Sequence, residues 1–204
     1  MSEAEPARRP GRPSTGGRRK VLDAGLSVLK AEGYAGLTTA KVAALAGQNK
    51  ALIGYHFGSK DGLVAAVARE VSATITEELL EGIGEPRDVR AVARGVVEGI
   101  ARIMKRDEGL ARLYFDLASH SVVEPEVRAI IAEMKEGYRE VLVTLLARAK
   151  DGPRSSHDAQ AAAVYLMASV EGFALEQLER GESPALKRAR EMFIRSAPTA
   201  VSGG

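Results

Sequence analysis

Apolar residues recur at intervals of three or four along almost the whole chain, the spacing that places side chains on one face of an amphipathic helix. One such series starts at Leu63 and continues through Val67, Val71, Ile75 and Leu79. No stretch alternates apolar and polar residues for long enough to form a convincing strand. The pattern therefore predicts an all-α fold.

Glycine and proline residues between these series mark the ends of the expected helices. Gly33 closes the first helix, Gly47 closes the second, and residues 82–86 break the series that begins at Leu63. The helix that contains this series is long enough to connect two domains. The expected helices cover residues 18–32, 38–46, 49–57, 60–81, 89–103, 108–120, 125–150, 158–180 and 184–196.

Residues 37–63 are predicted to form two short helices and the start of a third. Thr38 or Thr39 supplies a hydroxyl that can cap the first helix, and Gly47 tolerates the left-handed conformation that ends it. A helix, a tight glycine turn and a second helix form the helix-turn-helix pattern. Because any small helical protein can contain such a turn, the pattern alone leaves DNA binding and a purely structural turn both open.

The second short helix, over residues 49–57, is too short to be stable alone, so neighbouring helices must hold its few apolar residues. Its other face is then free for an outside partner. That face mixes amide, ammonium, phenol and imidazole groups with small residues, which would let the helix lie close to the base edges of a major groove. The predicted DNA-contacting residues are Gln48, Asn49, Lys50, Ala51, Gly54, Tyr55 and His56.

Four short elements around this helix have the order and spacing of a known family. They are Thr38-Thr39, Val42-Ala43, Ala46-Gly47 and the run YHFGSKDGL at residues 55–63. Over residues 19–67 the chain resembles the N-terminal domain of TetR-family transcriptional regulators.

This resemblance implies a role for each matching position. Residues 48–51 and 54–56 would lie on the recognition helix, and Thr38 and Thr39 would open the helix before it. Lys60 would stand at the start of the fourth helix, where the family contacts phosphate. Gln48-Asn49 replaces the Val-Ser that is commoner at this turn, so the base preference of other members does not transfer.

Charge is unevenly distributed along the chain, whose net charge is +2. Residues 1–60 hold ten Lys and Arg against four Asp and Glu, a net +6, which leaves −4 for the other 144 residues. A basic segment of about 60 residues joined to an acidic remainder fits a nucleic-acid-binding domain followed by a domain with a different function.

Residues 1–17 combine Pro, Gly and Ser with arginines and have almost nothing to bury, so they are expected to form a disordered basic arm. The Gly11-Arg12-Pro13 core resembles the hook with which some proteins place an arginine in a narrow minor groove. A tail that serves only solubility explains the same composition, so Arg12 is a supporting DNA contact at most.

The composition is that of a globular protein, with 45% apolar and 27% charged residues. The chain has no cysteine, and its first twenty residues are too basic for a secretory signal. The longest apolar run, residues 161–170, is only about half of a membrane span. We therefore expect a cytoplasmic location and no membrane partner.

The sequence contains no assembled catalytic or metal site. Three histidines are too few for a histidine-rich site, and both the HExxH motif and a glycine-rich phosphate loop are absent. Asp116 and His120 lie four residues apart on one expected helical face, where they could act as an acid-base couple, although an ordinary ion pair is the commoner arrangement. We predict no enzyme activity, no cofactor and no metal.

The C-terminal part, residues 61–204, is predicted to bind a ligand and to dimerise, while residues 18–60 form the DNA-binding domain. The resemblance implies that the last two helices form a four-helix bundle with a second copy. Glu171-Gly172-Phe173 resembles an Asp-Gly-hydrophobe element of the family, with Glu in place of Asp. A helix buried inside a monomer is the alternative interpretation.

About 140 residues of helix exceed what dimerisation needs, and helical bundles form cavities between facing helices. We therefore expect a small, largely apolar effector in the middle of the body, where methionine and tyrosine offer adaptable contacts and a polar group. The candidate ligand-binding residues are Met104, Tyr114, Phe115, Met134, Tyr138, Met167 and Phe173.

Together these features predict a ligand-responsive, sequence-specific DNA-binding regulator. In this hypothesis a homodimer represses transcription from a palindromic operator in double-stranded DNA, and a small molecule releases it. A helical ligand carrier that does not act on promoters would have a similar body. The basic head with its Tyr55-His56-Phe57 helix favours the regulator.

Overall fold

The computed structural model describes residues 15–201, which form helices joined by short connections and contain no strand. The all-α prediction is confirmed. The helices are α1 (Thr15–Gly36), α2 (Thr39–Ala46), α3 (Lys50–Phe57), α4 (Lys60–Ile83), α5 (Val89–Arg106), α6 (Glu108–His120), α7 (Pro125–Arg148), α8 (Ser156–Arg180) and α9 (Pro184–Val201). Within this range, no helix has both the length and the apolar character needed to cross a bilayer.

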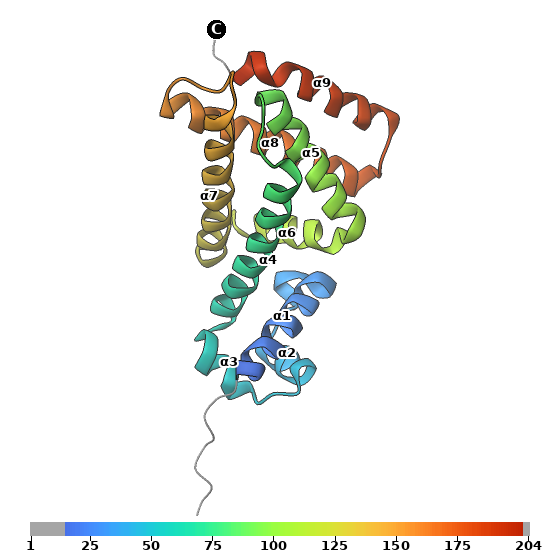
Figure 1. The fold of residues 1–204 in the computed structure, drawn as a ribbon. Helices are drawn as coiled ribbons and strands as arrows, with labels where there is room; N and C mark the ends of the chain where they lie inside the picture. The colour runs from blue at the N-terminus through green and yellow to red at the C-terminus, as the bar shows by residue number, and fades with distance from the viewer. Residues whose placement is uncertain (1–14, 202–204) are drawn as a thin grey trace, which may run out of the picture.

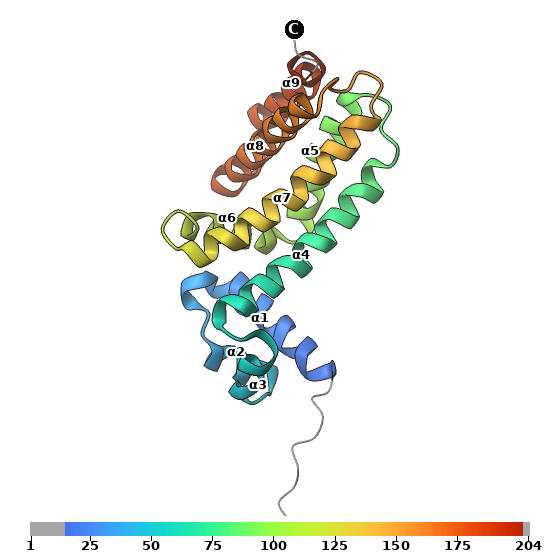
Figure 2. The same cartoon turned by 90° about the vertical axis from the view of Figure 1, so that its left-hand side faces the viewer.

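The helices separate into two regions that α4 connects (Figure 1). Helices α1 to α3 lie together at one end and are called the head here, while α5 to α9 form the body. The view in Figure 2 shows α4 leaving the head beside α1 and continuing along α7 into the body. One rigid element therefore starts directly after α3 and reaches deep into the body.

Two clusters of buried side chains hold these regions. The first includes Val21, Leu37, Ile53 and Leu63 of the head and α4, but it continues through Leu117 of α6 and into α7. The head and the near end of the body therefore share one core. The second cluster joins α5, α7, α8 and α9 at the far end, and its members include Val92, Leu146, Leu166 and Ile194.

Most predicted helix ends are within a few residues of the observed ones, and two differ for packing reasons. Helix α1 begins at Thr15, so the last three residues predicted to belong to the disordered arm are helical. Gly17 is buried between the exposed Gly16 and Arg18, so one side of this first turn is packed. Helix α9 continues beyond Ser196 through Pro198 to Val201, because Ala197 and Val201 are buried against the body and stabilise the extra turn.

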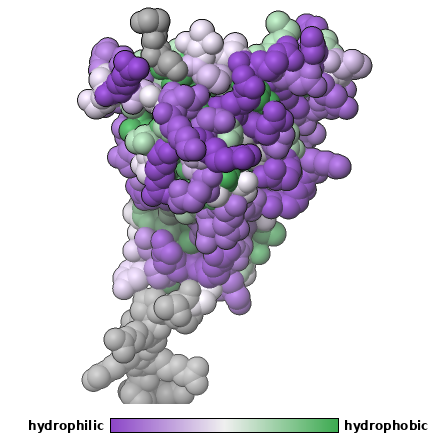
Figure 3. Space-filling view, turned by 45° about the horizontal axis from the view of Figure 1, so that its top comes forward, coloured by the Kyte–Doolittle hydropathy of each residue, from purple (hydrophilic) through white to green (hydrophobic). Residues whose placement is uncertain are grey.

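The face shown in Figure 3 is mostly hydrophilic, with small hydrophobic patches among the polar side chains. This distribution fits helices whose apolar stripes are turned toward a shared core. The candidate binding sites are therefore the exposed part of the head and the cavity inside the body.

Candidate nucleic-acid interface and ligand cavity

The turn between α2 and α3 is built by local hydrogen bonds. The Thr38 hydroxyl accepts the backbone N–H of Lys41 at 3.2 Å and caps α2, as predicted for Thr38 or Thr39. Gly47 adopts the left-handed conformation (φ 60°, ψ 38°), and the N–H of Gln48 donates to the carbonyl of Ala43 at 3.0 Å. These caps set the angle at which α3 leaves the turn.

Asn49 is the N-cap of α3. Its Oδ1 atom accepts the N–H of Ala51 at 2.8 Å, so the amide oxygen is occupied at the start of the helix. Only the amide NH₂ group remains to donate to a base edge. The cap thus gives Asn49 a structural role that the helical spacing alone did not reveal.

The outer face of α3 is open. Lys50, Ala51, Gly54 and Tyr55 are exposed, with Tyr55 at 70%, while Ile53 on the opposite face is 1% exposed and joins the head core. A Cβ atom added to Gly54 would have no neighbour within 4 Å. The backbone at Gly54 is therefore accessible to a closely approaching partner.

His56 is less accessible than its neighbours. The imidazole is half-buried, and its ring centroid lies 5.1 Å from that of Tyr55 and 6.0 Å from that of Phe57. Its Nε2 atom is buried without a hydrogen-bond partner among the described residues. Of the predicted recognition residues, His56 therefore faces the packed side of α3 more than the open side.

Lys60 begins α4, next to the N-cap Ser59, whose hydroxyl accepts the N–H of Gly62 at 3.0 Å. The Nζ atom of Lys60 lies 3.8 Å from the centre of the Tyr34 ring, an attractive cation–π arrangement. Gly62 is also required here, because an added Cβ would lie 1.9 Å from the Phe57 carbonyl oxygen. Arg12 lies outside the described residues.

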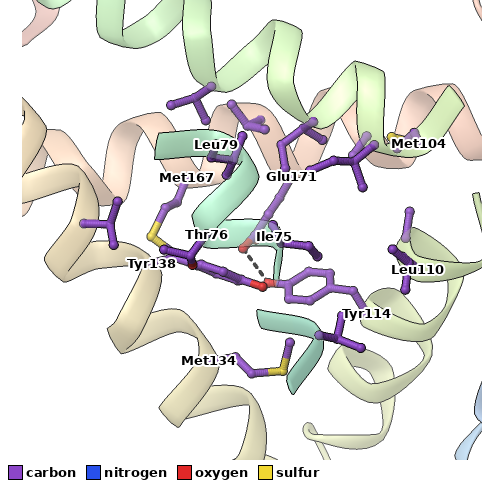
Figure 4. Close-up of a pocket in the computed structure, with 18 of the residues that line it drawn as sticks. Ile75, Thr76, Leu79, Met104, Leu110, Tyr114, Met134, Tyr138, Met167 and Glu171 are labelled. Carbon is purple, nitrogen blue, oxygen red and sulfur yellow. Dashed lines mark hydrogen bonds between the residues drawn. The ribbon is translucent and has the colours of Figure 1, made fainter. Parts of the chain in front are cut away.

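A cavity of about 140 Å³ lies between α4, α5, α6, α7 and α8, and its walls are almost wholly apolar. Figure 4 shows side chains from these helices pointing into it. Six of the seven predicted ligand-binding residues line it: Met104, Tyr114, Phe115, Met134, Tyr138 and Met167.

Phe173 does not line the cavity. Its ring packs against Phe193 of α9, with centroids 5.5 Å apart. Glu171, two residues earlier on α8, does line the cavity, because residues two positions apart point to nearly opposite sides of a helix. Sequence reasoning missed Glu171 as a lining residue, although it is the only carboxylate between Asp158 and Glu176 on a helix rich in small apolar residues.

Glu171 is the polar end of the cavity. Its Oε1 atom accepts the Tyr114 hydroxyl at 2.6 Å (Figure 4), and its Oε2 atom lies 3.1 Å from the Nζ atom of Lys135. Burial, with the hydrogen bond to Glu171, raises the pKa of Tyr114, and burial also raises the pKa of Tyr138. Both phenols therefore remain neutral hydrogen-bond donors at physiological pH.

Tyr138 separates the cavity from a groove on the outside of the body. Its hydroxyl donates to the Ser72 hydroxyl at 3.1 Å and so joins α7 to α4. The groove has a volume of about 540 Å³ and shares Thr76, Met134 and Tyr138 with the cavity wall. Tyr138 and Met134 therefore stand between the two spaces.

The Asp116–His120 pair is part of a junction between head and body. The Nε2 atom of His120 lies 3.8 Å from Asp116 Oδ1, and its Nδ1 atom is 3.0 Å from Glu124 Oε1. The second oxygen of Asp116 accepts the backbone N–H of Tyr34. Across the described range, no three His, Asp or Glu side chains converge as metal ligands.

The amino-acid sequence matches two family models that together span the head and the body. Residues 21–67 match "Bacterial regulatory proteins, tetR family", and residues 89–198 match "BetI-type transcriptional repressor, C-terminal". The chain belongs to the TetR family of bacterial regulatory proteins. The resemblance seen at residues 19–67 is thereby confirmed.

Curated relatives of this TetR-family chain are transcriptional regulators. The repressor AcnR of Corynebacterium efficiens is 27% identical over 169 residues, which cover 81% of this chain and 84% of the relative. The regulator BetI of Paraburkholderia phymatum is 27% identical over 170 residues, covering 81% and 83%.

Solved structures share the fold. A TetR-family regulator from Rhodococcus has a TM-score of 0.77 at 22% identity and covers 93% of this chain and all of its own. FadR of Bacillus subtilis, in complex with stearoyl-CoA, has a TM-score of 0.71 at 18% identity and covers 89% and 98%. With its family and fold established, the chain is a DNA-binding transcriptional regulator.

Proposed function

We propose that this TetR-family regulator is a repressor that binds a palindromic operator as a homodimer and leaves it when a small, largely apolar molecule enters the body. The observation that carries the proposal is the apolar cavity, whose walls include residues of α4. The same helix begins directly after the recognition helix α3. Occupancy of the cavity can therefore change the position of the head.

In the proposed complex, the open face of α3 enters the major groove. Lys50 and Ala51 stand at the start of the helix, the part that reads base edges in helix-turn-helix proteins, and Gln48 lies in the turn just before it. Asn49 caps the helix and contributes only its NH₂ group. Tyr55 and Lys60 contact DNA phosphates. Thr38 and Thr39 place the start of α2 against the sugar-phosphate backbone of the DNA. We further propose residues 18–60 as the DNA-binding domain and residues 61–204 as the effector and dimerisation domain.

The proposed dimer pairs α8 and α9 with the same helices of a second copy. Exposed large apolar side chains on these helices include Val164 at 51%, Leu175 at 40% and Met192 at 56%. Val164 and Leu175 are eleven residues apart, three helical turns, so they share one face of α8. Two recognition helices in successive major grooves would lie about 34–36 Å apart or more, which doubles the length of sequence that is read.

The size of the cavity limits the effector. A volume of about 140 Å³ is close to that of engineered cavities of about 150 Å³ that hold one benzene ring. A larger effector must displace Tyr138 or Met134 and extend toward the outer groove. Glu171 would accept a hydrogen bond from the effector in place of Tyr114. A Saccharomonospora viridis regulator of the same fold, in complex with choline, supports the proposal of a small organic effector.

A two-step experiment tests the proposal. Operator duplexes are first selected from random double-stranded DNA, and their dissociation constants are measured by fluorescence anisotropy at two salt concentrations. A thermal-shift screen of small apolar molecules then supplies effectors for the operator complex. We expect an effector to raise the operator Kd by about 5–150-fold, the range of typical allosteric coupling.

Two results would contradict this function. Uniform affinity for all DNA sequences would leave only a basic helical carrier, because phosphate contacts alone do not distinguish bases. A tight cavity ligand that leaves the operator Kd unchanged would remove the inducer mechanism, since a ligand with equal affinity for both states shifts no equilibrium.

A further inference from the structure

Helix α1 ends against α6 at an interrupted turn. Gly33 has a left-handed, non-helical backbone (φ 69°, ψ −175°), and the following N–H, that of Tyr34, donates to Asp116 Oδ2 at 2.6 Å. An added Cβ at Gly33 would lie 2.9 Å from Asp116 Oδ1. The carboxylate of Asp116, a residue of the body, therefore contacts the backbone of the head directly.

The Tyr34 side chain continues this contact to the start of α4. It is 6% exposed, and its hydroxyl donates to Asp61 Oδ1 at 2.7 Å. The Nζ atom of Lys60, the proposed phosphate contact, lies over the same ring. Burial and hydrogen bonds to Asp61 and Glu124 raise the pKa of Tyr34, so the phenol stays a donor.

On its other side, Asp116 directly follows two residues of α6 that line the cavity. Tyr114 and Phe115, the two residues before it on α6, line the cavity, and their rings pack together with centroids 5.3 Å apart. Successive residues of a helix move together, so an occupant that displaces α6 also displaces Asp116. A displacement that lengthens this 2.6 Å contact beyond about 3.2 Å weakens the hydrogen bond.

We propose that Asp116 and Tyr34 form a relay that reports cavity occupancy to Lys60 and the start of α4. This inference rests on the proposed function and adds a second connection to the one that α4 makes by itself. The relay runs from α6 through the end of α1 to α4, and each of its links is a hydrogen bond or a ring contact. Tyr34 and Asp116 are positioning residues, because they act on DNA through Lys60.

Other groups around the junction hold it in place. The His120 ring lies 5.1 Å from the Tyr34 ring and holds Glu124 through its Nδ1 atom. Lys30 of α1 forms a separate ion pair with Asp107 at 2.5 Å, at the boundary of α5 and α6. That ion pair also joins head to body, but it makes no contact with Lys60 or Asp61 in the described structure. It therefore provides a matched contact outside the relay.

The test uses operator DNA as the ligand, because coupling between two sites is reciprocal. The chain has no tryptophan, so Phe115→Trp places a single emission probe in the cavity wall. A selected operator duplex is titrated into this parent protein, and the tryptophan emission and the operator Kd are followed together. We expect the emission to change as the operator binds.

Four variants in the reporter background then test the relay. Tyr34→Phe removes the hydroxyl bond to Asp61, and Asp116→Ala removes the acceptor of the Tyr34 N–H. Both should lose more than half of the operator-induced emission change at saturating DNA. Asp116→Asn keeps an acceptor oxygen and should restore most of it. Lys30→Gln, which breaks the other head–body contact, should respond like the parent.

The outcomes separate the two proposals. A parent protein whose emission is unaffected by operator would overturn the coupling of cavity and DNA, and the relay with it. A responding parent whose Tyr34→Phe and Asp116→Ala variants respond equally would overturn the relay alone. Thermal melting of each variant shows whether it is folded. If Asp116→Ala does not fold, the response of Tyr34→Phe, which keeps the aromatic ring, tests the relay.

Discussion

The hydroxyl of Tyr114 on α6 donates a 2.6 Å hydrogen bond to Glu171 on α8, across a cavity whose other walls are apolar. This bond fixes the position of a carboxylate that would otherwise stand half-buried beside hydrocarbon. It also links α6 to α8, two of the helices that surround the cavity. Substitutions at Tyr114 and Glu171 can therefore distinguish an effect on stability from an effect on ligand binding.

Tyr114→Phe should lower the free energy of unfolding by about 1.5–3 kcal/mol, the range for a hydrogen bond to a charged group. Urea denaturation monitored by circular dichroism measures this change. Tyr55→Phe is the matched control, since Tyr55 is 70% exposed and its hydroxyl should contribute little to stability. Equal loss in both variants would contradict the role of the Tyr114–Glu171 bond.

Alkaline pH should destabilise the protein through Tyr114 and Tyr138. Because folding raises their pKa above the ordinary value of 10.0, their stabilising contribution is complete below pH 10 and is lost as pH rises further. Melting temperatures between pH 8 and about 11.5 should therefore fall less steeply in Tyr114→Phe than in the parent protein. Identical slopes in the two proteins would show that this phenol does not titrate differently on unfolding.

Asn49→Ala should lower stability by about 0.5–2 kcal/mol, because it removes the N-cap of α3. Asn49→Ser keeps a capping oxygen and removes the amide NH₂ group, so it should preserve stability and change only DNA affinity or preference. Thermal melting and operator anisotropy on the same samples distinguish these effects. If both variants melted alike, the cap would have no role in holding α3.

Lys60→Ala should weaken binding to all DNA sequences by a similar factor and reduce the magnitude of the slope of log K against log salt by about 1. The reason is that a phosphate contact releases counterions but reads no base. Lys105→Ala is the control, an exposed lysine at the end of α5 that is not among the proposed DNA contacts. A changed sequence preference with an unchanged salt slope would instead place Lys60 at the bases.

Val164→Asp should convert the proposed dimer to a monomer at micromolar concentration, because it places a charge in the centre of an apolar contact. Light scattering measures the mass directly, and operator affinity should fall with dimerisation. Val122→Asp is the matched control, an apolar residue that is 73% exposed on the turn between α6 and α7. A parent protein that is already monomeric at this concentration would refute the dimer itself.

Local interactions explain what could be predicted about the head from the sequence. The Thr38 cap, the left-handed Gly47 and the short helix before Phe57 depend on hydrogen bonds within a few residues, so the residue types at those positions suffice to predict them. The helical spacing of apolar residues is also a local property, so the helices were predicted with errors only at their ends. The extra turn of α9 was missed because burial of Val201, a tertiary effect, stabilises it.

Tertiary structure decided which side chains meet. The methionines and tyrosines of the cavity could be predicted as a class, but the exclusion of Phe173 and the inclusion of Glu171 depend on how α8 is rotated about its axis. Tyr34 and Asp116 are 82 residues apart, and nothing in the sequence around either residue specifies the other. The sequence by itself determined the helices, their caps and the family of this protein, because these depend on neighbours along the chain. The cavity and the junction of head with body required the folded chain, because packing between distant helices brings their residues together.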